Sequence, residues 1–488
     1  MAGTLPLPLV HELSPPPSVD FALRRCATWP GLILFDSARR NATLGRYSFL
    51  TADPLQWTVI DQPEYGRDPF ETLRNWQTEC RIDTIPGLPP FQGGIAGMLG
   101  YELGRCWERL PTPPHDEFEL PVLAAGCYDW VLAWDHQQNR AWIISQGQPE
   151  RITHNRQYRA EFRLGMVLGL LDPDQDPGPV YPARQWITTT TVDPAAPHPA
   201  PAFGATLHQL PQLDGLQSNF TPEAYLTAVD RVTEYIRAGD IYQANLSQRL
   251  LYPARESPIE LYLRLRACNA APFAGFFAHD DWAILSASPE RFLEVNQGIV
   301  TTRPIKGTRQ RRFPPEADLF TQDELLVSPK DVAENVMIVD LLRNDLSRVC
   351  RPGSVRIPQL CAIESYETVH HLVSEVQGDL EPDRDAWDLL AATFPGGSIT
   401  GCPKVRAMEI ITELEQVARG PYCGSLFYLG FDGTLDSSIL IRTLTHRRGW
   451  LQLPAGGGVV AQSDPQAEYE ETLHKAAGML RALRRQPQ

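Results

Sequence analysis

The chain has 488 residues, of which 43% are hydrophobic and 21% charged, so it can bury the core of roughly two or three average domains or of one large intertwined domain. Its formal net charge of -15 argues against nucleic acid or an anionic membrane as a partner, and no stretch approaches the roughly 20 apolar residues that span a bilayer. Nine scattered cysteines without a CxxC pair argue against a disulfide or zinc framework. The N-terminus shows no cationic leader followed by a long apolar core, so we expect a cytoplasmic location.

Five short apolar runs in the first half of the chain predict β-strands separated by turns. They lie at residues 31–35, 57–60, 94–99, 130–134 and 141–145. A proline-rich stretch at 172–217 then divides the sequence. We therefore predict an N-terminal scaffold or regulatory region at 1–205, the end of a proline-rich linker at 206–218, and a second domain at 219–488.

The second half opens with a clear helix start. Thr221 can act as the N-cap, Pro222 fits the first turn, and Gly239 ends the helix. Strand-like runs follow, two of them joined by the hairpin turn 296–298, and three long amphipathic helices come later. The strands are expected at 282–286, 291–295 and 299–303, and the helices at 329–346, 403–416 and 465–485. This mixed order indicates an α+β fold.

The sequence Pro304-Ile305-Lys306-Gly307-Thr308 follows the last of these strands. We expect Lys306 to lie where the sheet gives way to a loop, next to a glycine where backbone amides can face a ligand. Lys306 is therefore our candidate nucleophile. The alternative is a solvated surface lysine, because most lysines are exposed.

Two pairs of acidic residues share a spacing of three positions, which places both members of a pair on one face of a helix. The pairs are Asp331 with Glu334 and Glu468 with Glu471. Together they could surround one hard cation, and Mg2+ suits them best because it accepts carboxylate oxygens and retains waters. The alternative is that these acidic residues only complement a helix dipole.

Glycine-rich segments at 395–404 and 456–458 could present backbone amides to a carboxylate or phosphate, or serve as structural turns. Neither matches a Walker loop or a GxGxxG motif, which argues against nucleotide binding. Arg442 could grip a carboxylate, and His371 could point inward or be a structural histidine. Glu290 could work as an acid or base, or merely pair with its neighbouring arginine.

Several segments, taken in chain order, resemble the chorismate-utilising enzyme family. They read SASPERF, PIKGTR, KDVAENVMIVDLLRNDL, HHLVSEV, FPGGSITGCPKVRAMEII, SSILIRT, AGGGVV and EYEET. The similarity covers about 219–483, and the segment FQGGIAGMLGYE at 91–102 extends it into the first half. The resemblance implies an α+β fold of two facing β-sheets with helices packed outside.

Two positions separate the branches of that family. Anthranilate synthase large subunits typically have alanine where this chain has Lys306, whereas aminodeoxychorismate synthases typically have PIKGT. Isochorismate and salicylate synthases carry a water-activating lysine at the position of Gln243, and glutamine cannot serve as that base. The resemblance therefore implies amination of chorismate at C4 for 4-aminobenzoate and folate synthesis. The alternative is an anthranilate synthase, which aminates C2 for tryptophan synthesis.

The resemblance also implies a role for each candidate residue. Lys306 would attack C2 of chorismate as a free amine, which needs a depressed pKa, and Glu290 would act as the general acid at the C4 hydroxyl. Thr308 and His371 would position the ring, and the substrate-binding residues would be Gly307, Ser398, Gln243, Tyr422, Arg442 and Gly458. Glu334 and Glu471 would be the Mg2+ ligands, and Asp331 and Glu468 would hold the waters of the ion.

Ammonia is mostly ammonium at neutral pH, so it needs a sheltered source, and the chain has no GxCxGxQ-like nucleophile elbow. A separate glutamine amidotransferase subunit in a heterodimer is therefore expected. Related enzymes often hold tryptophan near a Leu-Leu-Glu-Ser sequence, which residues 34–37 fit loosely. A further alternative is a binding subunit that has lost turnover. The intact set of Glu290, Lys306, His371 and both acidic pairs argues against it.

Overall fold

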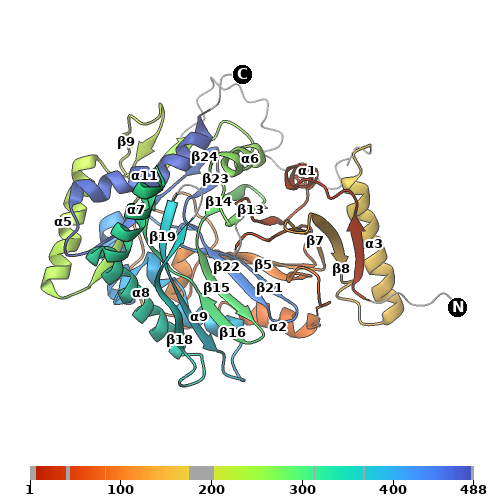
Figure 1. Cartoon of the computed structure of the whole chain (residues 1–488). Coiled ribbons are helices and arrows are strands. Elements are labelled where there is room, and N and C mark those ends of the chain that lie inside the picture. The colour runs from red at the N-terminus through yellow and green to blue at the C-terminus, as the bar shows by residue number, and fades with distance from the viewer. Residues whose placement is uncertain are drawn as a thin grey trace.

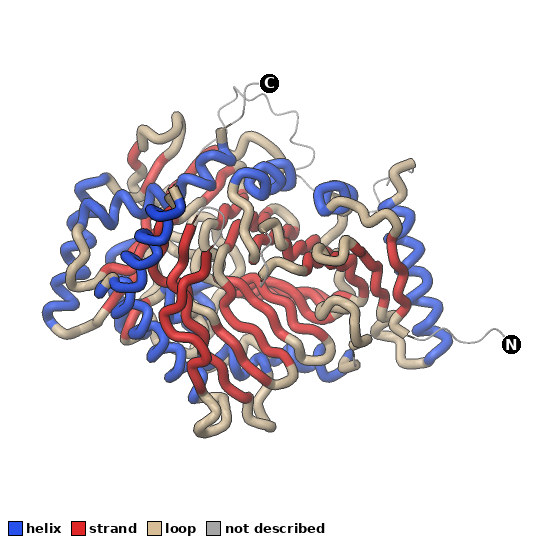
Figure 2. The backbone as a smooth tube through the Cα atoms, in the orientation of Figure 1, coloured by secondary structure: helices blue, strands red, loops and turns tan. Residues whose placement is uncertain are grey.

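The computed structural model describes residues 7–39, 44–82, 84–174, 203–312, 314–365 and 369–484. In this part of the chain, two large antiparallel sheets form the centre of the molecule (Figure 1). Helices surround the strands on the outside (Figure 2). None of the described helices is long and apolar enough to cross a membrane.

The larger sheet has twelve described strands. In spatial order they are β1 (Leu9–Leu13), β8 (Arg140–Ser145), β7 (Trp130–Asp135), β3 (Tyr47–Thr51), β2 (Leu32–Asp36), β13 (Phe273–His279), β14 (Trp282–Ser288), β23 (Thr443–Arg447), β24 (Trp450–Gln452), β12 (Leu250–Pro253), β10 (Gln217–Ser218) and β9 (His208–Gln209). Strands from the two halves of the chain meet where β2 pairs with β13, with Ile33 opposite Phe277.

The second sheet has ten described strands and also joins the two halves. Its order is β17 (Ile305–Gln310), β19 (Val369–Asp379), β16 (Ile299–Thr302), β15 (Arg291–Asn296), β22 (Leu435–Ile439), β21 (Ser425–Gly430), β5 (Gly94–Leu99), β6 (Leu123–Tyr128) and β4 (Gln56–Ile60), with β18 (Arg356–Ser365) also paired to β19. A small third sheet contains β20 (Gly401–Cys402), β11 (Gln243–Gln248) and β25 (Ala455–Val459).

The helices pack in three groups. The first group covers the twelve-stranded sheet and contains α1 (Val19–Arg25), α3 (Thr153–Leu171), α6 (Pro258–Cys268) and α11 (Pro465–Leu483). The second covers the ten-stranded sheet and contains α2 (Glu71–Cys80), α8 (Pro329–Ser347) and α9 (Ala386–Thr393). Around the small sheet lie α5 (Pro222–Ala238) and α10 (Lys404–Glu415). The remaining described helices are α7 (Pro315–Val327) and the short 3-10 helices η1 (Tyr101–Cys106) and η3 (Gly397–Ile399).

The alternating direction of side chains along each strand accounts for this layering of helices and sheets, because successive side chains of a strand point to opposite faces. In β7, Trp130 and Leu132 pack under the first helix group, whereas Val131 belongs to a central core. In β21, Phe427 packs under the second group, whereas Leu426 belongs to the same central core. The central core thus takes residues from both sheets, so the sheets face each other. This confirms the predicted α+β fold with two facing sheets and outer helices.

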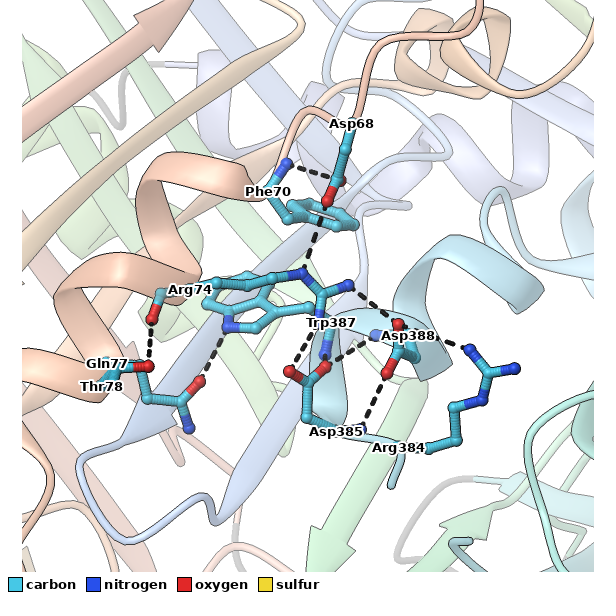
Figure 3. Close-up of polar contacts among 9 residues, drawn as sticks. All are labelled: Asp68, Phe70, Arg74, Gln77, Thr78, Arg384, Asp385, Trp387 and Asp388. Carbon is cyan, nitrogen blue, oxygen red and sulfur yellow. Dashed lines mark hydrogen bonds and ion pairs between the residues drawn. The ribbon is translucent and has the colours of Figure 1, made fainter. Parts of the chain in front are cut away.

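Helices α2 and α9, from opposite halves of the chain, are joined by polar and aromatic contacts (Figure 3). Arg74 of α2 contacts Asp385 at 2.5 Å and Asp388 at 3.0 Å, and Asp385 is also the N-cap of α9. The indole N–H of Trp387 donates to Gln77 Oε1 at 2.8 Å. The N-terminal half therefore supports the helices behind the ten-stranded sheet.

Local signals in the sequence predicted two features closely. The Thr221 side chain accepts a hydrogen bond from the Ala224 N–H at the start of α5, and Gly239 ends that helix with φ of +85°. The predicted hairpin turn lies between β15 and β16. Gln297 and Gly298 both adopt positive φ there, at +51° and +78°, as a tight two-residue hairpin turn requires.

Candidate active site

Lys306 lies within strand β17, at the edge of the ten-stranded sheet, so the predicted change from sheet to loop at this residue is wrong. Pro304 precedes the strand without ending the sheet, and Gly307 adopts φ of +77° where the pairing with β19 becomes irregular. The strand therefore continues through the glycine. Lys306 Nζ lies 2.9 Å from Glu334 Oε1 and donates to the carbonyl oxygen of Ser398 at 3.2 Å.

Glu334 reaches Lys306 from α8 and is also contacted from the small sheet. Gln243 in β11 is buried, and its Nε2 donates to Glu334 Oε1 at 3.2 Å. Gly458 in β25 leaves room for this contact. A Cβ at that position would overlap Gln243 Nε2 and lie 2.9 Å from Glu334 Oε1, so a larger residue there would displace one or both of these side chains.

Glu290 is a buried carboxylic acid that Ser398 connects to Lys306. The Ser398 hydroxyl donates to Glu290 Oε1 at 3.2 Å, while the Ser398 carbonyl accepts from Lys306. Burial raises the pKa of Glu290, and the charge of Lys306 only partly offsets this effect. A carboxylic acid that keeps its proton to a higher pH is suited to act as a general acid.

Lys306 carries its proton in this arrangement. Burial lowers its pKa, but the charge of Glu334 and the hydrogen bond to it outweigh burial, with Glu290 and Glu471 adding to the effect, so the pKa of Lys306 lies above its ordinary value. The described side chains alone therefore do not give the depressed pKa that a nucleophilic amine needs.

The second acidic pair lies on α11 and faces the glycines of β25. A Cβ at Gly457 would lie 3.1 Å from Glu468 Oε2 and 3.4 Å from Glu471 Oε1. Lys475 Nζ lies 2.6 Å from Glu471 Oε1 and donates to the carbonyl of Gly456 at 2.9 Å. Burial alone would raise the pKa of Glu471, but Lys475 holds it below its ordinary value. Lys475 was not among the predicted site residues, although its spacing of four from Glu471 was a signal for it.

Glu334 and Glu471 thus approach adjacent glycines of β25 from two different helices. This donor set fits magnesium, which commonly takes one or two protein carboxylates and completes its shell with waters and substrate oxygens. Within the described residues, no group of three or more His, Cys, Asp or Glu is placed to hold a metal. Asp331 contacts Arg309 at 2.8 Å. The water-holding roles of Asp331 and Glu468 stay a prediction.

The charge of Arg442 acts on both His371 and Glu290. Burial, followed by the charges of Arg442 and Arg39, lowers the pKa of His371 to about 4, so this imidazole is neutral at pH 7. Burial also lowers the pKa of Arg442, an effect that the nearby charge of Glu290 opposes. Arg442 adopts φ of +52° directly before β23.

Tyr422 and Thr308 are the remaining predicted site residues. Tyr422 is buried, and its ring centroid lies 5.6 Å from the guanidinium carbon of Arg419. The backbone of Thr308 pairs with His371 across β17 and β19. The side chain of Thr308 lies outside the described part of the chain.

A sequence profile described as chorismate binding enzyme matches residues 45–481. The chain belongs to this family. Aminodeoxychorismate synthase component 1 from Salmonella typhimurium is 42% identical over 471 residues, which cover 93% of each protein. Its counterpart from Klebsiella aerogenes is 38% identical over 480 residues, or 96% of this chain and 97% of the relative. Anthranilate synthase component 1 from a Synechocystis strain is 36% identical over 517 residues, or 97% of this chain and 94% of the relative.

Two solved structures agree with the fold. Anthranilate synthase component I from Streptococcus pneumoniae superposes with a TM-score of 0.73 at 29% identity, over 91% of this chain and 93% of that protein. The menaquinone-specific isochorismate synthase from Escherichia coli shares the fold, with a TM-score of 0.67 at 16% identity over 98% of this chain and 95% of that protein. The chain is therefore a chorismate-utilising enzyme, of the type of the aminodeoxychorismate synthase components and their anthranilate synthase relatives.

This chorismate-binding enzyme also has a cavity of about 600 Å³ between its two large sheets. Phe35 and Ser37, from the segment 34–37, line it together with Tyr428. The rings of Phe35 and Tyr428 lie 5.3 Å apart, and Asp36 is held by Arg266 at 2.6 Å. Aromatic walls with a hydroxyl at one side suit an amphipathic molecule. Tryptophan as its occupant stays a prediction.

Proposed function

We propose that this enzyme aminates chorismate at C4 with ammonia, giving 4-amino-4-deoxychorismate for 4-aminobenzoate and folate synthesis. The observation that carries the proposal is the placement of Lys306 against Glu334 and the Ser398 carbonyl, with the buried acid Glu290 on the same serine. Relatives at 38% and 42% identity are named aminodeoxychorismate synthase component 1, and the lysine in PIKGT resembles that branch.

In the proposed reaction Lys306 is the nucleophile and Glu290 the general acid. Lys306 first gives its proton to water. Its free amine then forms a bond to C2, the ring double bond shifts, and the C4 hydroxyl leaves as water with a proton from Glu290. Ammonia then forms a bond to C4, the double bond returns, and the bond between C2 and Lys306 breaks. A proton of the incoming ammonia goes to Glu290. Chorismate and ammonia thus give the aminated product and one water.

The same proposal gives the substrate-binding residues separate tasks. Arg442, Tyr422 and the amide of Gly458 bind the enolpyruvyl carboxylate, for which a guanidinium offers two parallel hydrogen bonds. Neutral His371 can donate a hydrogen bond to the ring substituents without adding a charge. Ser398, Gln243, Gly307 and Thr308 border the ring in this proposal.

Magnesium belongs to the proposal, with Glu334 and Glu471 as its ligands and Asp331 and Glu468 behind them. When bound, the ion would neutralise the ring carboxylate and engage the Glu334 carboxylate that otherwise favours the proton on Lys306. The protein's own part is to hold both carboxylates against the β25 glycines, so that the ligands are in place before the ion arrives.

A glutamine amidotransferase subunit is the proposed source of ammonia. The relatives at 38% and 42% identity are named component 1, which implies a second component in those enzymes. The aminating enzyme needs neutral ammonia, and a partner that releases it next to the site avoids its protonation in bulk water.

The alternative function is that of an anthranilate synthase component 1, because such relatives reach 36% identity over nearly the whole chain. Amination would then occur at C2, with loss of pyruvate. Lys306 supports the proposed function over this alternative, because an amine bonded to C2 would block that carbon and direct ammonia to C4.

The test is to incubate the purified chain with chorismate, Mg2+ and ammonium, and to identify the product by chromatography and mass. We expect a product that an added aminodeoxychorismate lyase converts to 4-aminobenzoate. Fluorescent anthranilate formed without the lyase would overturn the proposal in favour of the alternative. Lys306→Ala should bind chorismate and Mg2+ but lose more than roughly 100-fold in rate, since it lacks the nucleophile. Full retention of rate would remove the covalent role.

A further inference from the structure

Arg419 and Glu415 form an ion pair that is almost completely buried, with side-chain exposures of 2% and 1%. Two parallel hydrogen bonds join them, from Arg419 Nε to Glu415 Oε2 at 2.9 Å and from Nη2 to Oε1 at 2.7 Å. The rings of Tyr101 and Tyr422 lie 4.6 and 5.6 Å from the guanidinium carbon. The proposed reaction makes no use of this pair, and buried charges are costly unless every donor and acceptor is satisfied.

The remaining donors of Arg419 go to two walls of the active site. Nη1 donates to the carbonyl oxygen of Ile399 at 3.1 Å, and Nη2 to that of Asn245 at 2.5 Å. Ile399 follows Ser398, the residue that contacts both the amine and the acid of the site. Asn245 lies in β11 opposite Gly458. One guanidinium thus ties the serine turn to the small sheet.

Glu415 also binds the small sheet. Its Oε1 accepts both the backbone N–H and the hydroxyl of Ser247 in β11, each at 2.8 Å. Glu102 accepts the backbone N–H of Arg419 at 2.8 Å. Glu102 belongs to the segment 91–102 of the N-terminal half, which resembles the family but has no part in the proposed chemistry. The segment therefore braces the backbone that carries the arginine.

We propose that Arg419 is a positioning residue, which together with Glu415 fixes the Ser398 turn relative to β11 and Gly458. This inference rests on the proposed function. Arginine suits the task because its planar fork reaches one carboxylate and two carbonyls at once, whereas a lysine has a single point of charge on a flexible stem. A shift of about 1 Å in catalytic groups can cost about 100-fold in rate.

The test compares Arg419→Lys with Arg163→Lys, measuring chorismate consumption by the full chain with Mg2+ and ammonium. Arg163 is a matched control because it is also a buried arginine in an ion pair, with Asp129 at 3.2 Å, on α3 outside the twelve-stranded sheet. We expect kcat to fall about 100-fold in Arg419→Lys, with a smaller change in KM, and less than about threefold in Arg163→Lys. A merely structural role would lower the thermal midpoint of both variants without this kcat difference.

Equal kcat losses in the two variants would overturn the positioning role. If Arg419→Lys does not fold, Glu415→Gln provides the test, because it keeps the shape of the acid but loses the charge that binds the guanidinium. We expect its kcat to fall at least about tenfold. An unchanged kcat would overturn the positioning role. A wild-type chain that consumes no chorismate would instead overturn the proposed function, and the inference with it.

Discussion

Gly458 lies close to two active-site side chains, so its replacement by alanine tests the observed geometry directly. The added Cβ would overlap Gln243 Nε2 and press on Glu334 Oε1, and both side chains would have to move. We expect Gly458→Ala to lower kcat/KM for chorismate by at least about 100-fold, because displaced catalytic groups lose their alignment. Initial rates of chorismate consumption measure the effect.

The control for this change is Gly165→Ala. Gly165 lies in α3, and a Cβ there would meet nothing within 4 Å. Alanine favours a helix more than glycine does, so this variant should keep full activity and gain slightly in stability. A Gly458→Ala enzyme whose kcat/KM stays within about threefold of wild type would contradict the crowded geometry of the site.

Individual residues differ in how far the sequence could predict them. The acidic pairs and the glycine segments follow from local spacing, which is why they could be singled out as candidates. The local sequence predicts that the sheet gives way to a loop at Lys306, yet pairing with the distant strand β19 decides the conformation of this segment. The bond from Arg419 to Asn245 spans 174 positions, and no local pattern encodes such a contact.

At the scale of elements, the contact between α2 and α9 should carry a large share of the stability that the two halves give each other. Trp387 is fully buried, its ring lies 5.1 Å from that of Phe70, and its indole N–H bonds to Gln77. Trp387→Ala should lower the free energy of unfolding by roughly 3–5 kcal/mol, from lost apolar burial and the cavity left behind. Urea unfolding monitored by circular dichroism gives this value.

Trp387→Phe is the matched variant, because it keeps an aromatic ring in the same core and loses only the indole hydrogen bond and part of the volume. It should cost less than the alanine variant. A loss below about 1 kcal/mol in Trp387→Ala would show that α9 does not depend on this contact.

Helices and strands were predictable where their signals are local. Caps, prolines in first turns and the hairpin turn at 296–298 mark the ends of elements by interactions within a few residues. The order of strands in the sheets has no such signal. The pairing of β2 with β13 and of β5 with β21 brings together segments from the two halves, and side-chain burial across both sheets decides it.

At the scale of the whole molecule, both large sheets contain strands from both halves of the chain. Removing the first half would therefore expose the edges of β13 and β21, whose partners are β2 and β5. Unpaired strand edges are prone to aggregation. The N-terminal half is thus a structural part of each sheet, and it also supplies Glu102, which holds the backbone of Arg419.

Stability of the whole molecule should depend on pH through its buried histidines. Burial lowers the pKa of His446 to about 4, and the pKa of His371 is also lowered to about 4, against an ordinary value of 6.5. The folded chain keeps these rings neutral, whereas the unfolded chain protonates them below pH 6.5. The unfolded state therefore binds more protons between pH 6.5 and 4, and the free energy of unfolding falls as the pH falls through this window.

His446→Gln isolates one of these contributions, because His446 lies in β23, outside the group of active-site residues. One pKa unit corresponds to about 1.4 kcal/mol, so the histidine should account for roughly 2 kcal/mol of the loss between about pH 7.5 and about pH 5. Urea unfolding at both pH values measures the free energy of unfolding. Its loss on acidification should be smaller by that amount in the variant than in the wild type. If the free energy of unfolding falls by the same amount in both proteins, burial does not hold His446 neutral. The acid sensitivity of the fold must then come from other groups.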